Sequence, residues 1–158
     1  YSQHAQQITR SRVNKPSARV DELTGLAVMY RVAHQFDCDG GGVSIAQMES
    51  RLSVGPETIQ RMIRKLLKHN LVAYAGADAN QLIPARSLDH ITLGETLTAI
   101  RVEETLLPSS LLAEKAVTDI MQRFEDPLHN SLDDITLADW VRESTTADSS
   151  QLLPQKPE

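Results

Sequence analysis

Hydrophobic positions recur with helical spacing along residues 57–69, where apolar side chains share one face and charged side chains the other. The apolar positions of this stretch are Ile59, Met62, Ile63 and Leu66. Ser44, with Gln47 three residues later, forms a capping box that predicts a shorter helix just before it. Residues 53–56, Ser-Val-Gly-Pro, predict a tight turn between the two helices because Pro suits the first helical position. Asn70 is suited to end the longer helix in a left-handed conformation.

A β-hairpin is expected after this pair of helices. Two short apolar runs, residues 71–74 and 81–84, flank a segment rich in Ala, Gly, Asp and Asn. Thr92 and Glu95 form a second capping box, which predicts a helix that continues to about residue 103. A helix-turn-helix followed by a hairpin is the order of a winged-helix domain. We therefore expect a mainly α fold: a winged helix-turn-helix core with a small β-hairpin wing plus a C-terminal helical extension.

Further helices are expected on both sides of this core. Apolar spacing predicts a helix over residues 21–36, which the polar and glycine-rich residues 37–42 would end. After the core, we expect a helix over residues 111–125, ended before Pro127, and a last short helix over 136–143. We expect the large apolar side chains of these later helices to cover the core or a second copy of the chain: Leu111, Leu112, Ile120, Met121, Phe124 and Trp140.

The chain divides on these grounds into four segments. They are a basic lead-in (1–19), a winged-helix domain (20–104), a helical extension packed on that core (105–143) and a disordered tail (144–158). The first residue is Tyr rather than Met, which we interpret as the boundary of a fragment of a longer protein. No apolar run approaches the roughly 20 residues of a membrane-spanning helix.

Charge is unevenly placed along the chain. The formal net charge is −5 over 158 residues, yet residues 1–20 contain no acid. The cations of this lead-in are Arg10, Arg12, Lys15 and Arg19. The remaining residues therefore hold 12 of the 16 Lys and Arg residues and all 21 Asp and Glu residues. An acidic body attracts phosphate backbones poorly, whereas the lead-in suits either DNA or an anionic membrane surface.

The longer helix of the helix-turn-helix carries the candidate nucleic-acid site. Its cationic face consists of Arg61, Arg64, Lys65 and Lys68, at the recognition-helix position of such domains. The alternative is an ordinary solvated face of an amphipathic helix. Two features favour that alternative. Glu57 lies in the first turn, where side chains that read bases usually enter, and the wing offers Asp78 but no Lys or Arg.

No group of residues has the spacing of a catalytic or metal site. Asp37 and Asp39 begin like a calcium loop, but Gly41 and Met48 stand where that loop needs ligands. Cys38 is the single cysteine, so a disulfide within the chain is impossible. The scattered histidines fit no metal motif, and residues 40–42 lack the Lys and Ser or Thr of a phosphate loop. We therefore expect no enzyme, no cofactor and no metal.

Residues 23–101 resemble redox-type winged-helix repressors of bacteria. The stretches that carry the resemblance are residues 43–47, the helix 57–69 with Leu71 and Val72 after it, and residues 84–95. That family has a glycine-rich basic wing and often three cysteines that hold an iron–sulfur cluster. This chain has neither of these features.

A second resemblance covers more of the chain. It looks like the C-terminal extension of YihY/BrkB-family bacterial inner-membrane proteins, in which membrane helices come first. A segment like 131–142, which contains Leu137 and Trp140, often closes that extension. The basic residues 10–19 fit the excess of positive charge on the cytoplasmic side of a membrane helix. The resemblance implies a location at the cytoplasmic face of the bacterial inner membrane.

Two functions follow from these observations. The leading one is a non-enzymatic cytoplasmic regulatory or protein-interaction module of a membrane protein. Its partner would be another protein, a second copy of the chain, or anionic lipid contacted by the lead-in. The alternative is a DNA-binding transcription regulator that uses the Arg and Lys face of the helix 57–69. The acidic body and the cation-free wing favour the first of these.

Overall fold

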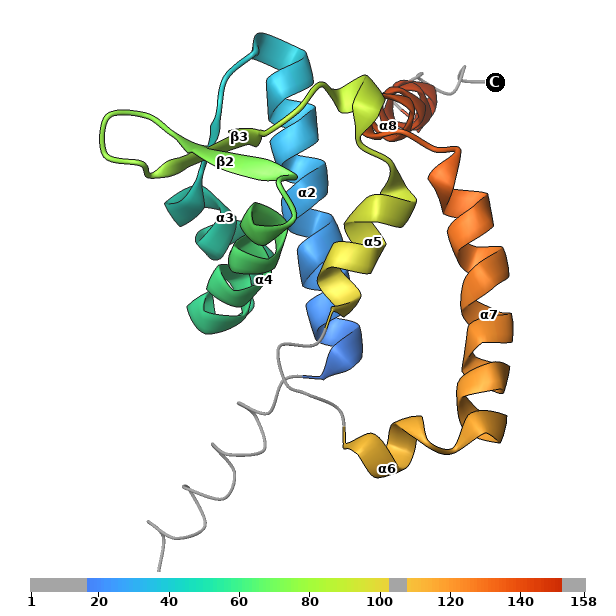
Figure 1. The fold of residues 1–158 in the computed structure, drawn as a ribbon. Coiled ribbons are helices and arrows are strands. Elements are labelled where there is room, and N and C mark those ends of the chain that lie inside the picture. Colours follow the sequence, from blue (N-terminus) through green and yellow to red (C-terminus); the bar gives the residue numbers. More distant parts are fainter. Residues whose placement is uncertain (1–16, 103–107, 152–158) are drawn as a thin grey trace, which may run out of the picture.

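A computed structural model describes residues 17–102 and 108–151 (Figure 1). A long helix, α2 (Ala18–Asp39), runs through the centre, and the helix-turn-helix pair, α3 (Ile45–Leu52) and α4 (Pro56–Lys68), lies beside it. The Ser44 hydroxyl accepts a hydrogen bond from the backbone N–H of Gln47 at 3.5 Å, which confirms the first capping box. Asn70 has a φ of +57°, the predicted left-handed conformation.

The predicted hairpin belongs to a three-stranded antiparallel sheet. Its strands are β1 (Val43–Ser44), β2 (Val72–Ala75) and β3 (Gln81–Pro84), in the order β1-β3-β2. Tyr74 lies opposite Leu82 across the hairpin, and Val43 lies opposite the same leucine from β1. β1 was not predicted because a strand of two residues shows no alternation. The hairpin projects from the body on the side of α3 and α4 (Figure 1).

The core forms around α2. This helix contacts α4, α5 (Leu93–Arg101), β3 and the last helix, α8 (Leu137–Gln151). Side chains from every one of these elements are fully or almost fully buried: Val28, Met29, Val32, Ile59, Met62, Ile63, Leu66, Leu82, Ile100, Leu137 and Val141. The apolar face predicted for residues 57–69 is therefore the face of α4 that packs on α2. α2 begins earlier and ends later than the predicted helix 21–36, and Gly40, at a φ of +71°, provides its C-cap.

The C-terminal extension differs from its prediction at two helix ends. α6 (Ser109–Leu112) is short, and α7 (Lys115–Asp133) continues through Pro127 instead of stopping before it. Proline removes one helical hydrogen bond, and the carbonyl of residue 123 loses its donor. The side chains around this turn are exposed, so water reaches that carbonyl.

α8 extends to Gln151, so the prediction of a disordered tail from residue 144 was wrong for residues 144–151. The hydroxyls of Ser144 and Thr145 donate to the Val141 carbonyl at 2.9 and 2.8 Å. Serine and threonine hydroxyls can donate to a carbonyl in the preceding turn of a helix. The polar residues after 143 are therefore compatible with a continuous helix.

Residues 135–137 hold the extension to the core. The backbone N–H of Leu93 donates to the carbonyl of Ile135 at 2.8 Å, and that of Leu137 donates to Ile91 at 2.9 Å. Thr136 and Asp139 form a capping box for α8, with both hydrogen bonds at 3.2 Å. Trp140 is partly buried and meets the ring of Tyr30 with centroids 5.0 Å apart.

The predicted covering of the core by the other large apolar side chains of the extension is not observed. Only the C-terminal part of α7 approaches α5: Gly94 lies against Asp133, and the Thr98 hydroxyl is 3.4 Å from the His129 ring. The remaining apolar side chains are 37–73% exposed, and α7 has no buried residue: Leu111, Leu112, Val117, Ile120, Met121, Phe124 and Leu128. We call this set the α7 stripe. No residue within 17–102 and 108–151 buries it.

Candidate nucleic-acid interface

The four cations predicted on α4 divide into two pairs. The Arg61 guanidinium is 2.5 Å from Asp21 in the first turn of α2, and both side chains are about four-fifths buried, with 23% and 18% exposed. The Lys65 ammonium donates to the carbonyl of Ile100, in the last turn of α5, at 3.0 Å. A cation is favourable there because helix C-termini carry partial negative charge. Arg61 and Lys65 therefore hold the helices together.

Arg64 and Lys68 are the free pair. Both side chains are exposed, and neither has a hydrogen bond or ion pair with the part of the chain that the structure describes. They lie one turn apart on the face of α4 opposite the buried Ile59 and Ile63. Glu57 shares this face and is also exposed, so the free surface is less positive than the sequence suggested.

The helix-turn-helix is fixed internally by polar contacts. The Gln60 amide of α4 donates to Glu49 of α3 at 3.3 Å.

Arg86, just after the wing, pairs with Glu95 and also donates to the carbonyls of Asn70 and His90, at 3.3 and 3.5 Å. It thereby ties the end of α4 to the start of α5. Nothing local in the sequence distinguishes Arg86 from an ordinary exposed cation, so this role could not be predicted.

The wing offers no positive charge. β2, β3 and the turn between them contain no Lys or Arg, and Asp78 is exposed at the turn. Tyr74 is 46% exposed on β2 and is the largest side chain that the hairpin presents to solvent. Contact with a phosphate backbone by this hairpin would have to use uncharged donors: backbone N–H groups, the side-chain amides of Asn80 and Gln81, and the Tyr74 hydroxyl.

Other predicted residues fall partly outside the described ranges. Arg10, Arg12 and Lys15 of the basic lead-in lie outside them, and Arg19 is exposed in the first turn of α2. Within residues 17–102 and 108–151, no three His, Cys, Asp or Glu side chains are placed to hold a metal ion. No helix among those residues is long and apolar enough to cross a membrane. Cys38 is exposed, with its sulfur 3.9 Å from the His34 ring.

Several solved structures have the same arrangement of helices and strands over most of their length. IscR of T. potens is 20% identical, with a TM-score of 0.64 over 90% of this chain and 93% of its own. The chain has the winged helix-turn-helix fold. CymR of B. subtilis, a global cysteine regulator, is 18% identical with a TM-score of 0.58, over 82% of this chain and 97% of its own. CymR of Staphylococcus aureus is 16% identical, also at 0.58, over 77% and 95%.

This likeness is one of fold. The sequence matches no family model and no curated relative. The structural likeness supports the winged-helix resemblance drawn from residues 23–101. The IscR match covers nearly the whole of both chains, so the likeness also includes α7 and α8. It does not bear on the YihY/BrkB resemblance, which stays a prediction.

Proposed function

We propose that this chain is a DNA-binding winged-helix module of a transcription regulator, without enzymatic activity, acting in the cytoplasm. The observation that carries the proposal is the free pair Arg64 and Lys68 on the outer face of α4, the second helix of the helix-turn-helix. That helix is the one that enters the major groove in such domains. The likeness to regulators supports this function over the interaction module that the sequence favoured.

The charge count predicts weak binding by one copy. Each phosphate contact releases counterions, and two free cations on α4 give a salt slope of only about −1.8 for B-DNA. The acidic body opposes binding further. A second copy on the same duplex doubles the contacts, so we infer that the functional unit contains two chains.

The α7 stripe is suited to join those two copies. α7 is amphipathic: its apolar face is unburied, and its opposite face carries Lys115, Gln122 and Asp126. Between Met121, Phe124 and Leu128 on one side and α2 and α5 on the other lies a groove of about 670 Å³. A contiguous exposed apolar face marks an interaction surface in a soluble protein. We propose that α7 of a second copy occupies this groove in a two-fold arrangement.

The DNA-binding proposal is tested by titrating labelled genomic and random duplexes at about 0.15 M salt. We expect Arg64→Ala and Lys68→Ala each to weaken binding and to reduce the salt slope by about 0.9. The control is Arg142→Ala, which removes an exposed cation from α8. Equal effects of all three changes, or no duplex binding by the unaltered chain, would refute the proposal.

The two-copy arrangement is tested by sedimentation over a range of concentrations. Phe124→Glu places a charge in the stripe and should give a monomer, whereas Gln122→Glu adds the same charge on the opposite face and should not. A monomeric unaltered chain would refute self-association and leave the DNA-binding proposal standing.

A second candidate function, the interaction module of a membrane protein, is favoured by the same exposed stripe. In that case the stripe docks on another protein, and the cations 10–19 lie against anionic lipid. Each of these cations would contribute about 1 kcal/mol to the free energy of binding to the anionic surface. Binding to anionic but not neutral vesicles, lost on deletion of residues 1–20, would support this candidate. A long apolar segment encoded upstream of Tyr1 would support it independently.

A further inference from the structure

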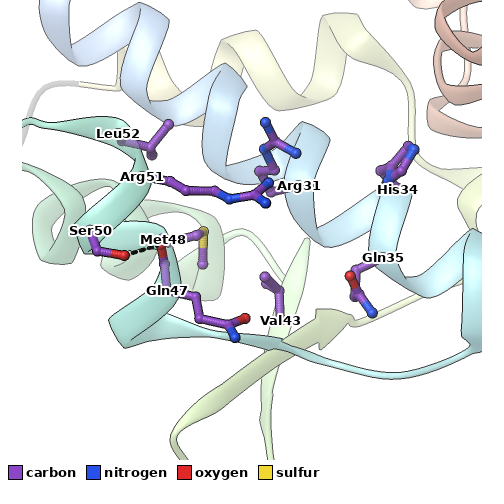
Figure 2. Close-up of a pocket in the computed structure, with 9 residues that line it drawn as sticks. All are labelled: Arg31, His34, Gln35, Val43, Gln47, Met48, Ser50, Arg51 and Leu52. Atoms are coloured by element: carbon purple, nitrogen blue, oxygen red, sulfur yellow. Dashed lines mark hydrogen bonds between the residues drawn. The ribbon is translucent and has the colours of Figure 1, made fainter. Parts of the chain in front are cut away.

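A cavity lies between α2, β1 and α3, on the inner side of the helix-turn-helix (Figure 2). Its volume is about 210 Å³, smaller than the 300–1,000 Å³ of typical drug-sized ligand sites. Val43, Met48 and Leu52 form its apolar wall. The remaining lining is polar and contains no carboxylate: Arg31, His34, Gln35, Gln47, Ser50 and Arg51. The volume suits a small ion or metabolite, and the lining suits a negative one.

Two arginines line this cavity. Arg31 extends from α2 and Arg51 extends from α3 toward it (Figure 2). Neither has an ion pair or hydrogen bond with the described part of the chain. The other arginines that face neighbouring elements are all paired with acids: Arg61, Arg86 and Arg101. Two cations on one small cavity repel each other, and no described residue provides a counterion for either of them.

Two acids close in sequence to the lining residues have other partners. Glu49 accepts a hydrogen bond from the Gln60 amide at 3.3 Å. Asp39 accepts hydrogen bonds from the Gln35 amide at 2.7 Å and from the Gly41 backbone N–H at 2.8 Å. Those bonds direct its carboxylate to the end of α2. Ser50 donates its hydroxyl proton to the backbone carbonyl of Gln47 at 3.0 Å. The side-chain amide of Gln47 adds a neutral donor to the lining.

We propose that this cavity binds a small oxyanion, a phosphate or a carboxylate, held by Arg31 and Arg51 together. Guanidinium groups match the oxygen geometry of both anions and bind them in a bidentate manner. The apolar wall strengthens the attraction by lowering the local dielectric. The anion could be a free molecule or a phosphate of the DNA backbone. The inference rests on the cavity alone and not on the function proposed above.

Binding would also tie α2 to α3. Because the two arginines come from different helices, an anion between them replaces repulsion by two attractive contacts across that junction. A ligand that binds only the folded chain raises its stability with concentration. The melting temperature should therefore rise with phosphate concentration and approach a logarithmic dependence above the dissociation constant.

The test uses inorganic phosphate as the probe, with chloride at matched ionic strength as the reference. We expect saturable binding by calorimetry, with affinity reduced at least tenfold in Arg31→Gln and in Arg51→Gln. The control is Arg19→Gln, which removes the same charge from the exposed first turn of α2 and should change the affinity less than twofold. Far-UV circular dichroism confirms that each variant is folded.

A second arm distinguishes the source of the anion. If phosphate does not bind, but both cavity variants weaken duplex binding and lower its salt slope while Arg142→Gln, on the exposed surface of α8, does not, the anion is a DNA phosphate. If phosphate binds and the two cavity variants leave duplex binding unchanged, the anion is a free molecule. The proposal is overturned if phosphate acts no differently from chloride and duplex binding is unaffected. It is overturned equally if Arg19→Gln loses as much affinity as the cavity variants.

Discussion

The ion pair with Asp21 holds Arg61 away from Arg64 and Lys68 on the exposed face of α4. Asp21→Asn should break this pair and free the Arg61 side chain. Both side chains are mostly buried, at 23% and 18% exposed, so the pair is shielded more than a surface ion pair. Removing one partner of a buried pair costs about 3–5 kcal/mol when the other charge stays buried, and turning Arg61 to solvent lowers this cost toward the 0.2–1 kcal/mol or so of a surface pair. The chain should therefore stay folded, and Arg61 should turn to solvent beside Arg64, one turn away.

The magnitude of the effect on DNA binding follows from the number of phosphate contacts. One additional contact per bound copy steepens the salt dependence of log K by about 0.9. Between 50 and 200 mM salt, the variant should therefore lose about 3.5-fold more affinity per copy than the unaltered chain. Fluorescence anisotropy with a labelled duplex at several salt concentrations measures this slope directly.

The matched control is Glu22→Gln. It changes the net charge by the same amount, on the same turn of α2, but releases Arg101 of α5, whose guanidinium is 2.8 Å from Glu22. If the two variants steepen the slope equally, the cause is net charge and not the release of Arg61. In that case the assignment of the α4 face as the DNA-contacting surface fails.

Three further predictions concern the attachment of the extension. Leu137→Ala should cost about 2–5 kcal/mol in denaturant unfolding, because the side chain is fully buried. Gly94→Ala should destabilise by about 1–3 kcal/mol, since an added Cβ would collide with the Asp133 carboxylate and lie 3.2 Å from its backbone nitrogen. The backbone N–H of Thr136, and then its hydroxyl, lower the pKa of Asp139 from the usual 3.8. The stabilisation by Asp139 should therefore be complete above that value and fade as the pH falls through the lowered pKa, so the denaturation midpoints of the unaltered chain and Asp139→Asn should differ above pH 3.8 and converge as the pH falls below it.

The core of the fold could be predicted because its signals are local. Ser44 and Thr92 each cap a helix through a residue three positions later, and Asn70 needs only its own backbone. The helix ends in the extension were mistaken because Pro127 and the polar residues after 143 usually mark boundaries. Neither marks one here, because an exposed turn tolerates the lost hydrogen bond and hydroxyls bond within the helix.

The candidate site was harder to predict because it depends on distant partners. Arg61 meets an acid 40 residues away in the sequence, and Lys65 meets a carbonyl 35 residues away. Helical periodicity places all four cations on one face of α4. It does not predict which of them form hydrogen bonds or ion pairs with a neighbouring helix. Arg31 and Arg51 went unnoticed for a related reason. They lie on separate helices, and only packing of α2 against α3 brings them to one cavity.

The one-sided attachment of α7 has a geometric consequence. The helix is held near Gly94 and Asp133, while its N-terminal half has no buried contact within the described chain. Its 19 residues span about 28 Å, so a tilt of about 10° at the anchored end moves the other end by about 5 Å. In a two-fold pair joined through α7, that tilt would set the distance between the two α4 helices. The two halves of a DNA site lie about 34 Å apart when they are separated by one turn of the duplex. The contact at Gly94, which sets the tilt of α7, would then determine whether the two α4 helices match that spacing.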